Sequence, residues 1–354
     1  MVKQEDRIKA FVKLGDFFRQ YIAKKKEEIA FDSPEDFWFS ALDQAVVSAG
    51  QKNPWFTREQ VEYALITWGD LLTLNNLNKW LSSYNLTQTK NRTVAIVMAG
   101  NIPLVGFHDF LCTIITGNKA LIKSSSNDTV LLPMISLYLK DIEPGLSSQI
   151  EFTEGRLTDF DAVIATGSNN TARYFEHYFG KKPNIIRRNR NSIAILNGEE
   201  SDLELKSLGE DIFRYYGLGC RNVSKLYVPE GYKFNRFFES IESYNYLNNQ
   251  HKYVNNYDYN KAVYLMSEFS FLDNGFFILK EDKTYASPIA TVFYEFYSDL
   301  QSLTDKLQQD SEQLQCIIGS AALSNTVPFG SAQLPTLKDY ADGIDTVEFL
   351  LKTS

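Results

Sequence analysis

The chain is poor in the residues that build disulfide frameworks and metal centres. Its 354 residues include three cysteines and three histidines, with no CxxC or HxxxH pattern. An odd, unpaired set of cysteines argues against a disulfide framework and indicates a reducing compartment. The histidines at 108, 177 and 251 lie far apart in the sequence. We therefore expect no metal site.

Long apolar runs and an excess of positive charge are also missing. No uncharged apolar stretch reaches the ~18 residues that a membrane-spanning helix needs. Residues 1–31 alternate charged and apolar positions, as an amphipathic helix does and a signal peptide does not. The net charge of -8 argues against a nucleic-acid or anionic-membrane surface. We expect a soluble, cytoplasmic protein with no membrane span and no nucleic-acid partner.

Apolar and aromatic residues are plentiful. The chain is 44% hydrophobic and 14% aromatic, mostly Phe and Tyr. That length and composition suit two globular domains. The aromatic residues fit an ordinary core, and a long apolar tunnel for a ligand is the alternative.

The periodicity of the sequence changes near residue 92. The first 86 residues have mainly helical patterns, and from there short apolar runs alternate with helical stretches. Such alternation predicts an α/β fold with a parallel sheet and helices on both faces. A polar, Asn- and Tyr-rich stretch at 243–261 is expected to be a loop. The expected strands are 93–98, 120–123, 161–166 and 192–196.

Cys220 is the most informative position. A helix-like segment leads into Gly-Leu-Gly at 217–219, the cysteine follows, and an apolar β-rich run comes next. Glycines beside a cysteine leave room for a reacting carbonyl carbon, because no Cβ blocks the approach. Arg221 adds a positive charge of the kind that stabilises a thiolate. The alternative is a small buried core residue, which suits the apolar surroundings of Cys112 and Cys316.

Two strand ends predict an anion-binding edge, although the chain has no GxGxxG fingerprint. Strand 161–166 ends at Gly167 and Ser168, where free N–H groups at a helix start suit a phosphate. An ordinary helix N-cap is the alternative there. Lys123 closes the strand at 120–123, at the sheet edge where α/β ligands bind. The alternative for Lys123 is a surface lysine.

Five short motifs follow one another between residues 92 and 349. They are Ala-Gly-Asn-Ile-Pro-Leu at 99–104, Gly-Asn-Lys-Ala-Leu-Ile-Lys at 117–123, Thr-Gly-Ser at 166–168, Gly-Leu-Gly-Cys at 217–220, and Val-Pro-Phe-Gly at 327–330 with the downstream segment 343–349. Together they resemble the motifs of the aldehyde dehydrogenase superfamily. The resemblance is greatest to its fatty acyl-CoA reductase branch, which includes the reductase subunit of bioluminescence systems.

The resemblance implies an aldehyde dehydrogenase-like fold with two Rossmann-like three-layer α/β domains and a helical N-terminal segment. It implies that Cys220 is the acyl-accepting nucleophile. The side-chain amide of Asn101 and the backbone N–H of Cys220 would form the oxyanion hole. Lys123 would reach the adenosine ribose of a dinucleotide, and Gly167 and Ser168 would lie against its pyrophosphate.

The domain organisation follows from the same motifs. Residues 1–190 are expected to hold the helical segment and the dinucleotide-binding domain. Residues 191–330 are expected to form the catalytic domain with the nucleophile. The remaining segment, 331–354, would supply an oligomerisation strand near 346–351.

Two departures from the family pattern inform the chemistry. Hydrolytic members carry a Glu-Leu-Gly-Gly segment whose glutamate activates water, and residues 185–191 here contain no carboxylate. The absence favours reduction over acid formation. Many members also place an acid three residues after the lysine, where this chain has Ser126. A carboxylate would repel a 2′-phosphate and a serine would not, so we expect NADPH rather than NADH.

The function we predict is NADPH-dependent reduction of an acyl thioester to an aldehyde through a thioacyl-cysteine intermediate. Fatty acyl-CoA is the favoured substrate, and an acyl-protein thioester is the other donor considered. A homodimer and an acyl-transferring protein partner stay open. The alternatives are a cysteine-dependent acyltransferase or thioesterase without hydride transfer, and a non-catalytic aldehyde dehydrogenase-like scaffold.

Overall fold

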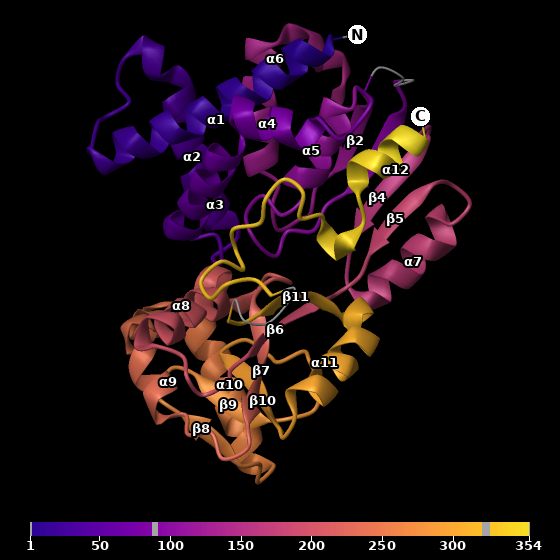
Figure 1. The fold of residues 1–354 in the computed structure, drawn as a ribbon. Helices are drawn as coiled ribbons and strands as arrows, with labels where there is room; N and C mark the ends of the chain where they lie inside the picture. The colour runs from indigo at the N-terminus through magenta and orange to yellow at the C-terminus, as the bar shows by residue number, and fades with distance from the viewer. Residues whose placement is uncertain (1, 87–90, 321–325, 354) are drawn as a thin grey trace. The chain divides into compact units, whose positions relative to one another are not determined.

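Two mainly parallel sheets organise the computed structural model, which describes residues 2–86, 91–320 and 326–353 (Figure 1). The contacts divide the chain into two units, Met1–Arg188 with Thr336–Ser354, and Asn189–Pro335. The first sheet has the strand order β3-β2-β1-β4-β5 and the second β11-β6-β7-β10-β9-β8. All neighbouring pairs are parallel except β8 with β9. The predicted α/β fold is confirmed.

The first unit carries the N-terminal helices and the first sheet. Its strands are β1 (Thr93–Val97), β2 (Lys119–Lys123), β3 (Ile150–Phe152), β4 (Ala162–Thr166) and β5 (Asn184–Arg187). Its helices are α1 (Gln4–Lys26), η1 (Pro34–Asp36), α2 (Phe37–Lys52), α3 (Arg58–Leu71), α4 (Leu74–Leu81), α5 (Phe107–Ile115), α6 (Leu131–Ile142), η3 (Pro144–Ser148), α7 (Asn169–Phe179), η7 (Ala341–Gly343) and α12 (Thr346–Lys352).

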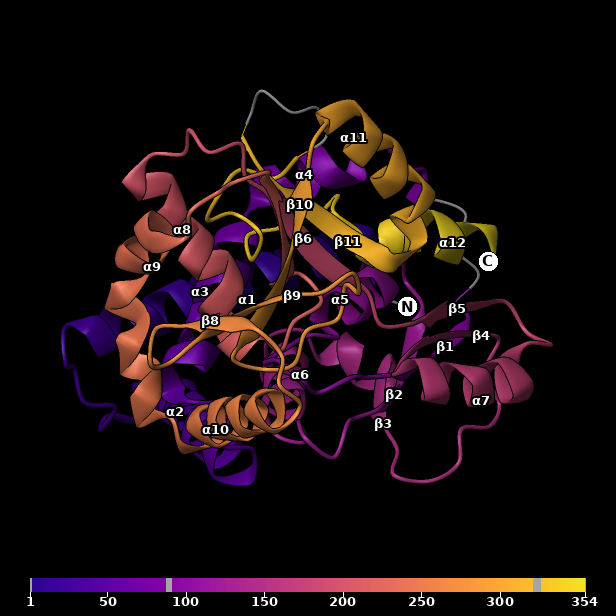
Figure 2. The ribbon, with the colours of Figure 1, turned by 90° about the horizontal axis from the view of Figure 1, so that it is seen from below.

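Side chains of β1 alternate between two cores of this unit. Val94 and Ile96 join the large core that α1 to α6 and α12 complete. Ala95 joins the smaller core on the other face, with Phe175 of α7 packed against it. Successive strand residues point to opposite faces, so the apolar run at 93–97 is buried on both sides. Figures 1 and 2 show α7 alone on one face of this sheet.

The second unit surrounds the other sheet with helices in the same way. Figures 1 and 2 show α8, α9 and α10 on one face and α11 on the other. Its strands are β6 (Asn191–Ile195), β7 (Val223–Pro229), β8 (Phe271–Asp273), β9 (Ile278–Glu281), β10 (Thr291–Tyr297) and β11 (Leu314–Ile318). Its helices are α8 (Asp202–Phe213), η4 (Arg214–Gly217), α9 (Asn235–Ser240), η5 (Glu242–Asn249), α10 (His251–Met266), α11 (Leu300–Gln309) and η6 (Ser311–Gln313).

Two expectations about local structure are wrong. The stretch 243–261, expected to be a loop, lies within η5 and α10. Its buried residues Tyr253, Tyr257, Asn260 and Tyr264 recur at the three- and four-residue spacing of one helix face, and its asparagines concealed that pattern. The strand expected at 346–351 is the helix α12. Asp345 caps this helix by accepting a hydrogen bond from the N–H of Glu348 at 2.8 Å.

The C-terminal segment is fastened to the first unit by a buried ion pair. Arg187 donates to the Asp109 carboxylate at 2.6 Å and to the Thr346 hydroxyl at 3.1 Å. It also donates to the main-chain carbonyl of Ala341 at 2.5 Å. All three side chains are buried. Arg187 ends β5, so the last strand of this sheet and the returning chain share one anchor.

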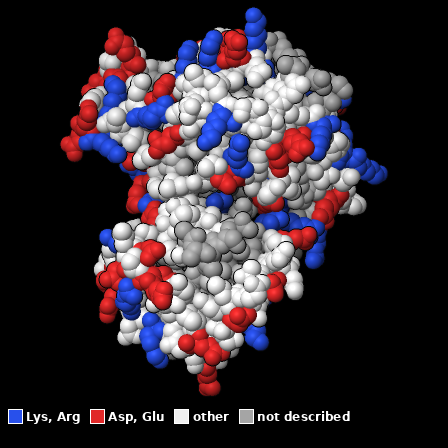
Figure 3. Space-filling view, viewed as in Figure 1, with Lys and Arg blue, Asp and Glu red and all other residues white. Residues whose placement is uncertain are grey.

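Charges are mixed over the surface seen in Figure 3, where Lys and Arg alternate with Asp and Glu without forming one basic patch. Among the residues that the structure describes, no helix is both long and apolar enough to cross a membrane.

Candidate active site

Three neighbouring strands of the first sheet deliver five of the six residues that the sequence singled out. β2, β1 and β4 lie side by side and run parallel. Their carboxyl ends therefore meet at one edge of the sheet, where α/β folds bind ligands. Lys123 and Ser126 follow β2, Asn101 follows β1, and Gly167 and Ser168 follow β4.

The loops after β1 and β2 touch each other. A β-carbon at Gly100 would lie 2.6 Å from Ser125 Oγ, so the turn that carries Asn101 needs a glycine there. Lys123 donates from Nζ to the carbonyl of Gly155 at 3.0 Å. Ser126 is exposed. The nearest acid in that loop, Asp128, accepts a hydrogen bond from Leu131 N at 3.3 Å, and burial raises its pKa.

Ser168 caps helix α7. Its Oγ accepts a hydrogen bond from the N–H of Thr171 at 3.2 Å, which is the N-cap alternative considered from the sequence. The other N–H groups of the first turn still point out of the helix end, and Ser168 itself is exposed. A lysine and a capped helix N-terminus at one sheet edge fit a dinucleotide, since both attract phosphate.

Cys220 belongs to the second unit and is exposed, whereas Cys112 is buried and Cys316 is partly buried. The main chain before it is strained. Tyr215 and Tyr216 have φ of 53° and 57°, and Gly217 has φ of 77°. Left-handed conformations are rare for bulky residues and cost about 1–3 kcal/mol each. This turn connects helix α8 to the Gly-Leu-Gly-Cys loop.

Two buried side chains hold the main chain on both sides of Cys220. Ser192 of β6 donates from Oγ to the carbonyl of Cys220 at 2.8 Å. The Oδ1 of Asn222 accepts from the N–H of Gly219 at 2.8 Å. The Nδ2 of Asn222 donates to the carbonyls of Asp211, Ile212 and Arg214 at 3.1, 3.2 and 2.8 Å. One amide thus ties the Cys220 loop to the end of α8.

Arg221 and Asp211 reach the same turn of chain at 328–332. Arg221 Nε donates to the carbonyl of Ala332. The Asp211 carboxylate accepts from the N–H of Gly330 at 2.6 Å and from that of Ala332 at 2.8 Å. Burial raises the pKa of Asp211 to about 7, against those two hydrogen bonds, which lower it.

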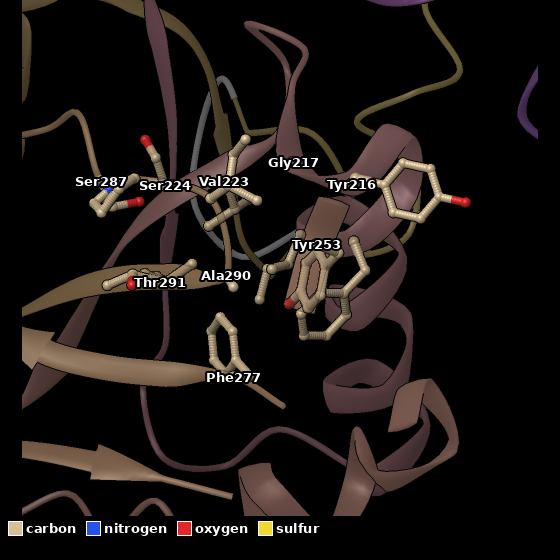
Figure 4. Close-up of a pocket in the computed structure, with 14 residues that line it drawn as sticks. Tyr216, Gly217, Val223, Ser224, Tyr253, Phe277, Ser287, Ala290 and Thr291 are labelled. Atoms are coloured by element: carbon tan, nitrogen blue, oxygen red, sulfur yellow. The ribbon is translucent and has the colours of Figure 1, made fainter. Parts of the chain in front are cut away.

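A small cavity lies behind the Cys220 loop. It has a volume of about 30 Å³ and is lined by residues on either side of Cys220, among them Gly217 and Val223. Figure 4 shows the ring of Phe277 on its other side, near Tyr253. The Tyr253 hydroxyl is buried and has no hydrogen-bond partner among the described residues. Such a space holds one or two waters and is too small for a long acyl chain.

Sequence reasoning missed Ser192, Asn222 and Asp211. Ser192 is the second residue of the strand β6, and Asn222 follows Cys220 by two residues. A polar residue inside a buried strand, or next to a reactive cysteine, is a signal that was available. Asp211 gave no such signal, because an acid in an amphipathic helix normally faces water.

Comparison with solved structures identifies the fold. Aldehyde dehydrogenase 21 from Physcomitrella patens has a TM-score of 0.65 at 13% identity, covering 99% of this chain and 84% of that one. Aldehyde dehydrogenase KauB from Pseudomonas aeruginosa has a TM-score of 0.64 at 11% identity, covering 92% and 73%. An aldehyde dehydrogenase from Bacillus cereus, solved as an NAD+ complex, has a TM-score of 0.58 at 12% identity, covering 91% and 73%. The chain has the aldehyde dehydrogenase-like fold, as the motifs implied.

Sequence comparison then gives the family within that fold. The family model "Acyl-CoA reductase (LuxC)" matches residues 41–277, and this chain belongs to that family. A long-chain acyl-protein thioester reductase from Aliivibrio fischeri is 25% identical over an alignment of 235 residues, and the match covers 60% of this chain and 48% of that protein. The match therefore spans about half the length of that relative.

Proposed function

We propose that this chain reduces an acyl thioester to an aldehyde through a thioacyl intermediate on Cys220, with NADPH as the reductant. The observation that carries the proposal is an exposed cysteine in a glycine loop whose main chain is held by Ser192 and Asn222. Fatty acyl-CoA is the proposed substrate, with an acyl-protein thioester as the other donor. The Aliivibrio relative's name, which includes an acyl-protein thioester, supports that second donor.

The first half of the reaction is acyl transfer to Cys220. Its thiolate attacks the thioester carbonyl carbon, so a new carbon–sulfur bond forms and the carbonyl oxygen becomes an oxyanion. The Asn101 amide and the N–H of Cys220 are the proposed donors to that oxyanion. The bond to the original sulfur then breaks, and the donor leaves as a thiolate that takes a proton from water. A donor of this kind is worth about 10²–10³ in rate.

The cofactor is assigned to the edge formed by β2, β1 and β4. Lys123 and Ser126 would hold its adenosine end, and Gly167 and Ser168 its pyrophosphate. When bound, NADPH supplies the hydride that reduces the thioacyl carbon. The carbon–sulfur bond to Cys220 then breaks, which releases the aldehyde and restores the thiolate. Ser126 carries no charge that would repel a 2′-phosphate, and the Asp128 carboxylate already accepts a hydrogen bond at the start of α6. Both observations support NADPH as the cofactor.

Hydrolysis of the intermediate is disfavoured on this chain. Residues 185–191 contain no carboxylate that could activate water. Arg187 in that segment is buried and paired with Asp109, so it holds structure rather than a water. A thioacyl group on Cys220 should persist until it is reduced.

The test is the loss of NADPH absorbance with a panel of acyl-CoAs of increasing chain length. The wild type is compared with Cys220→Ala and with Cys112→Ala, the same change at the buried cysteine of the other unit. We expect acyl-CoA-dependent oxidation in the wild type and Cys112→Ala, and none in Cys220→Ala. Activity that survives in Cys220→Ala would refute the covalent mechanism.

A second readout separates the competing functions. CoA release without NADPH oxidation, lost in Cys220→Ala, would favour the acyltransferase or thioesterase. No CoA release and no oxidation with any thioester, including an acylated carrier protein, would favour the non-catalytic scaffold.

The proposed oxyanion hole is tested by Asn101→Ala, which should lower the rate by about 10²–10³. The control is Asn255→Ala, at an exposed asparagine of α10, which should change the rate by less than about twofold.

A further inference from the structure

Asp211 is a buried carboxylate that the reaction above does not use. It lies on α8, is fully buried, and accepts the N–H groups of Gly330 and Ala332 at 2.6 and 2.8 Å. The charged side chains that face it are Glu210, its neighbour on α8, and Arg221 of the Cys220 loop. Glu210 is itself paired with Arg214 at 2.5 Å. The 328–332 turn contributes no charge.

The turn at 328–332 is fastened to α8 over its whole length. Ser331 N donates to the Pro328 carbonyl at 3.1 Å, which closes the turn. Gly330 has φ of +81°, and a β-carbon there would come within 3.0 Å of Ser207 Cβ on α8. A left-handed glycine lets the chain lie this close to the helix. Both N–H groups of the turn that face α8 then end on the single carboxylate of Asp211.

The same turn is also hydrogen-bonded to the Cys220 loop. Ala332 donates its N–H to Asp211, and its carbonyl accepts from Arg221 Nε. Arg221 is peptide-bonded to Cys220. The path from Asp211 through Ala332 to Arg221 therefore ends at the residue next to Cys220, and it adds a third hold on this loop to those of Ser192 and Asn222.

We propose that Asp211 is a positioning residue for Cys220, acting through the 328–332 turn and Arg221. The ionised carboxylate, which Asp211 forms above its raised pKa of about 7, suits this role because each of its two oxygens accepts one N–H. An amide of the same shape has one acceptor, and its NH₂ group would face the second N–H as a donor against a donor. Asp211→Asn should therefore free one end of the turn while keeping the size of the side chain.

The first measurement is amide hydrogen exchange in the free protein, which needs no substrate. In Asp211→Asn the amides of Gly330 and Ala332 should exchange roughly tenfold faster, because an unbonded N–H is less protected. Asp202→Asn is the matched control, since it makes the same change in the first turn of α8 at an exposed residue paired with Arg236. It should leave both amides unchanged.

The second measurement reports on the nucleophile. The rate of Cys220 alkylation by iodoacetamide should change in Asp211→Asn and not in Asp202→Asn. The consequence for turnover rests on the proposed function: kcat should fall roughly tenfold while KM for the acyl thioester and for NADPH stays within about twofold. A residue that only supports the fold would not separate kcat from KM in this way.

A double-mutant cycle with Arg221→Met tests the path itself. If Asp211 and Arg221 act through one turn, the double variant should be about as impaired as the worse single variant. If Asp211→Asn fails to fold, Arg221→Met still tests the path, because it removes the hydrogen bond from Arg221 to the Ala332 carbonyl. Additive effects, unchanged exchange at Gly330 and Ala332, or faster exchange with normal Cys220 alkylation would each overturn the proposal. A wild type without reductase activity would refute the proposed function. The hydrogen-exchange and alkylation results would then still test the positioning role of Asp211.

Discussion

Ser192 donates a hydrogen bond of 2.8 Å from its Oγ to the main-chain carbonyl of Cys220. The same Oγ lies 3.0 Å from the sulfur of Cys316. Because the hydroxyl proton goes to the Cys220 carbonyl, the thiol of Cys316 is the donor in the second contact. Two hydrogen bonds in series thereby anchor the Cys220 peptide to β6 and β6 to β11.

Replacing Ser192 by alanine should slow acyl transfer without unfolding the protein. The change removes the contact with the Cys316 thiol and the hydrogen bond to the Cys220 carbonyl. The second of these is worth about 1 kcal/mol, and that energy corresponds to roughly fivefold in kcat. Steady-state kinetics with an acyl-CoA measures it. The control is Ser240→Ala, where the lost hydroxyl bonds only to the Arg236 carbonyl of the exposed helix α9. Equal effects of the two changes would contradict the anchoring role.

Asn222→Asp should destabilise the second unit strongly. The substitution keeps the shape of the side chain but turns two donors into an acceptor that faces three carbonyl oxygens. Buried polar groups left unsatisfied cost about 1–3 kcal/mol, and more for a charge. Urea unfolding followed by circular dichroism measures the loss. Asn255→Asp on the exposed side of α10 should stay within about 0.5 kcal/mol.

Asp109→Ala should weaken the first unit by about 3–5 kcal/mol, because it leaves the buried guanidinium of Arg187 unpaired. Tryptophan fluorescence during urea unfolding reports on this unit alone, since all four tryptophans belong to it: Trp38, Trp55, Trp68 and Trp80. Asp6→Ala removes a carboxylate whose Lys9 contact is 3.9 Å long and exposed, and should have no measurable effect. A small loss in Asp109→Ala would mean that water or another group takes the place of the carboxylate.

The three cysteines should react with iodoacetamide in a fixed order at neutral pH. Cys220 is exposed, Cys316 is partly buried and Cys112 is buried. Burial also raises the pKa of the Cys112 thiol, which leaves little thiolate there to react. We expect Cys220 to be alkylated at least roughly tenfold faster than Cys316, and Cys112 only after denaturation. Peptide mass spectrometry of timed samples shows the order, and early labelling of Cys112 would contradict it.

Stability should depend on pH through Asp211. Its pKa is raised by burial to about 7 in the folded state, against about 4 in an unfolded chain. The folded protein therefore keeps a proton that the unfolded chain releases between about pH 4 and pH 7, so this group's contribution to stability falls as pH rises through that window. Asp211→Asn cannot titrate. The stability advantage of the wild type over Asp211→Asn should shrink from pH 4 to pH 7, as urea unfolding of both proteins measures. The pKa of Asp128 is also raised, but both proteins contain this residue, so its contribution to the pH dependence cancels in their difference.

Local signals in the sequence predicted the strands well. The apolar runs at 93–98, 120–123, 161–166 and 192–196 correspond to β1, β2, β4 and β6, because a strand buried on both faces has a continuous apolar sequence. Prediction failed where polar residues occupy a helix that is half buried. Helix α10 buries Tyr253, Tyr257, Asn260 and Tyr264 on one face. Its polar composition, which includes the exposed Asn255, suggested a loop instead.

The sequence by itself determined the α/β class, the family and the residues proposed for chemistry. These depend on periodicity and on short motifs, which are local and can be recognised without knowing which distant residues come together. Tertiary structure alone decided which side chains hold the Cys220 loop. Ser192 and Cys220 are 28 positions apart, and Asp211 and Ala332 are 121 positions apart. Hydrogen bonds between residues so distant form only after the sheet and helix α8 have packed, because packing supplies the short distances and excludes the water that would otherwise satisfy those groups.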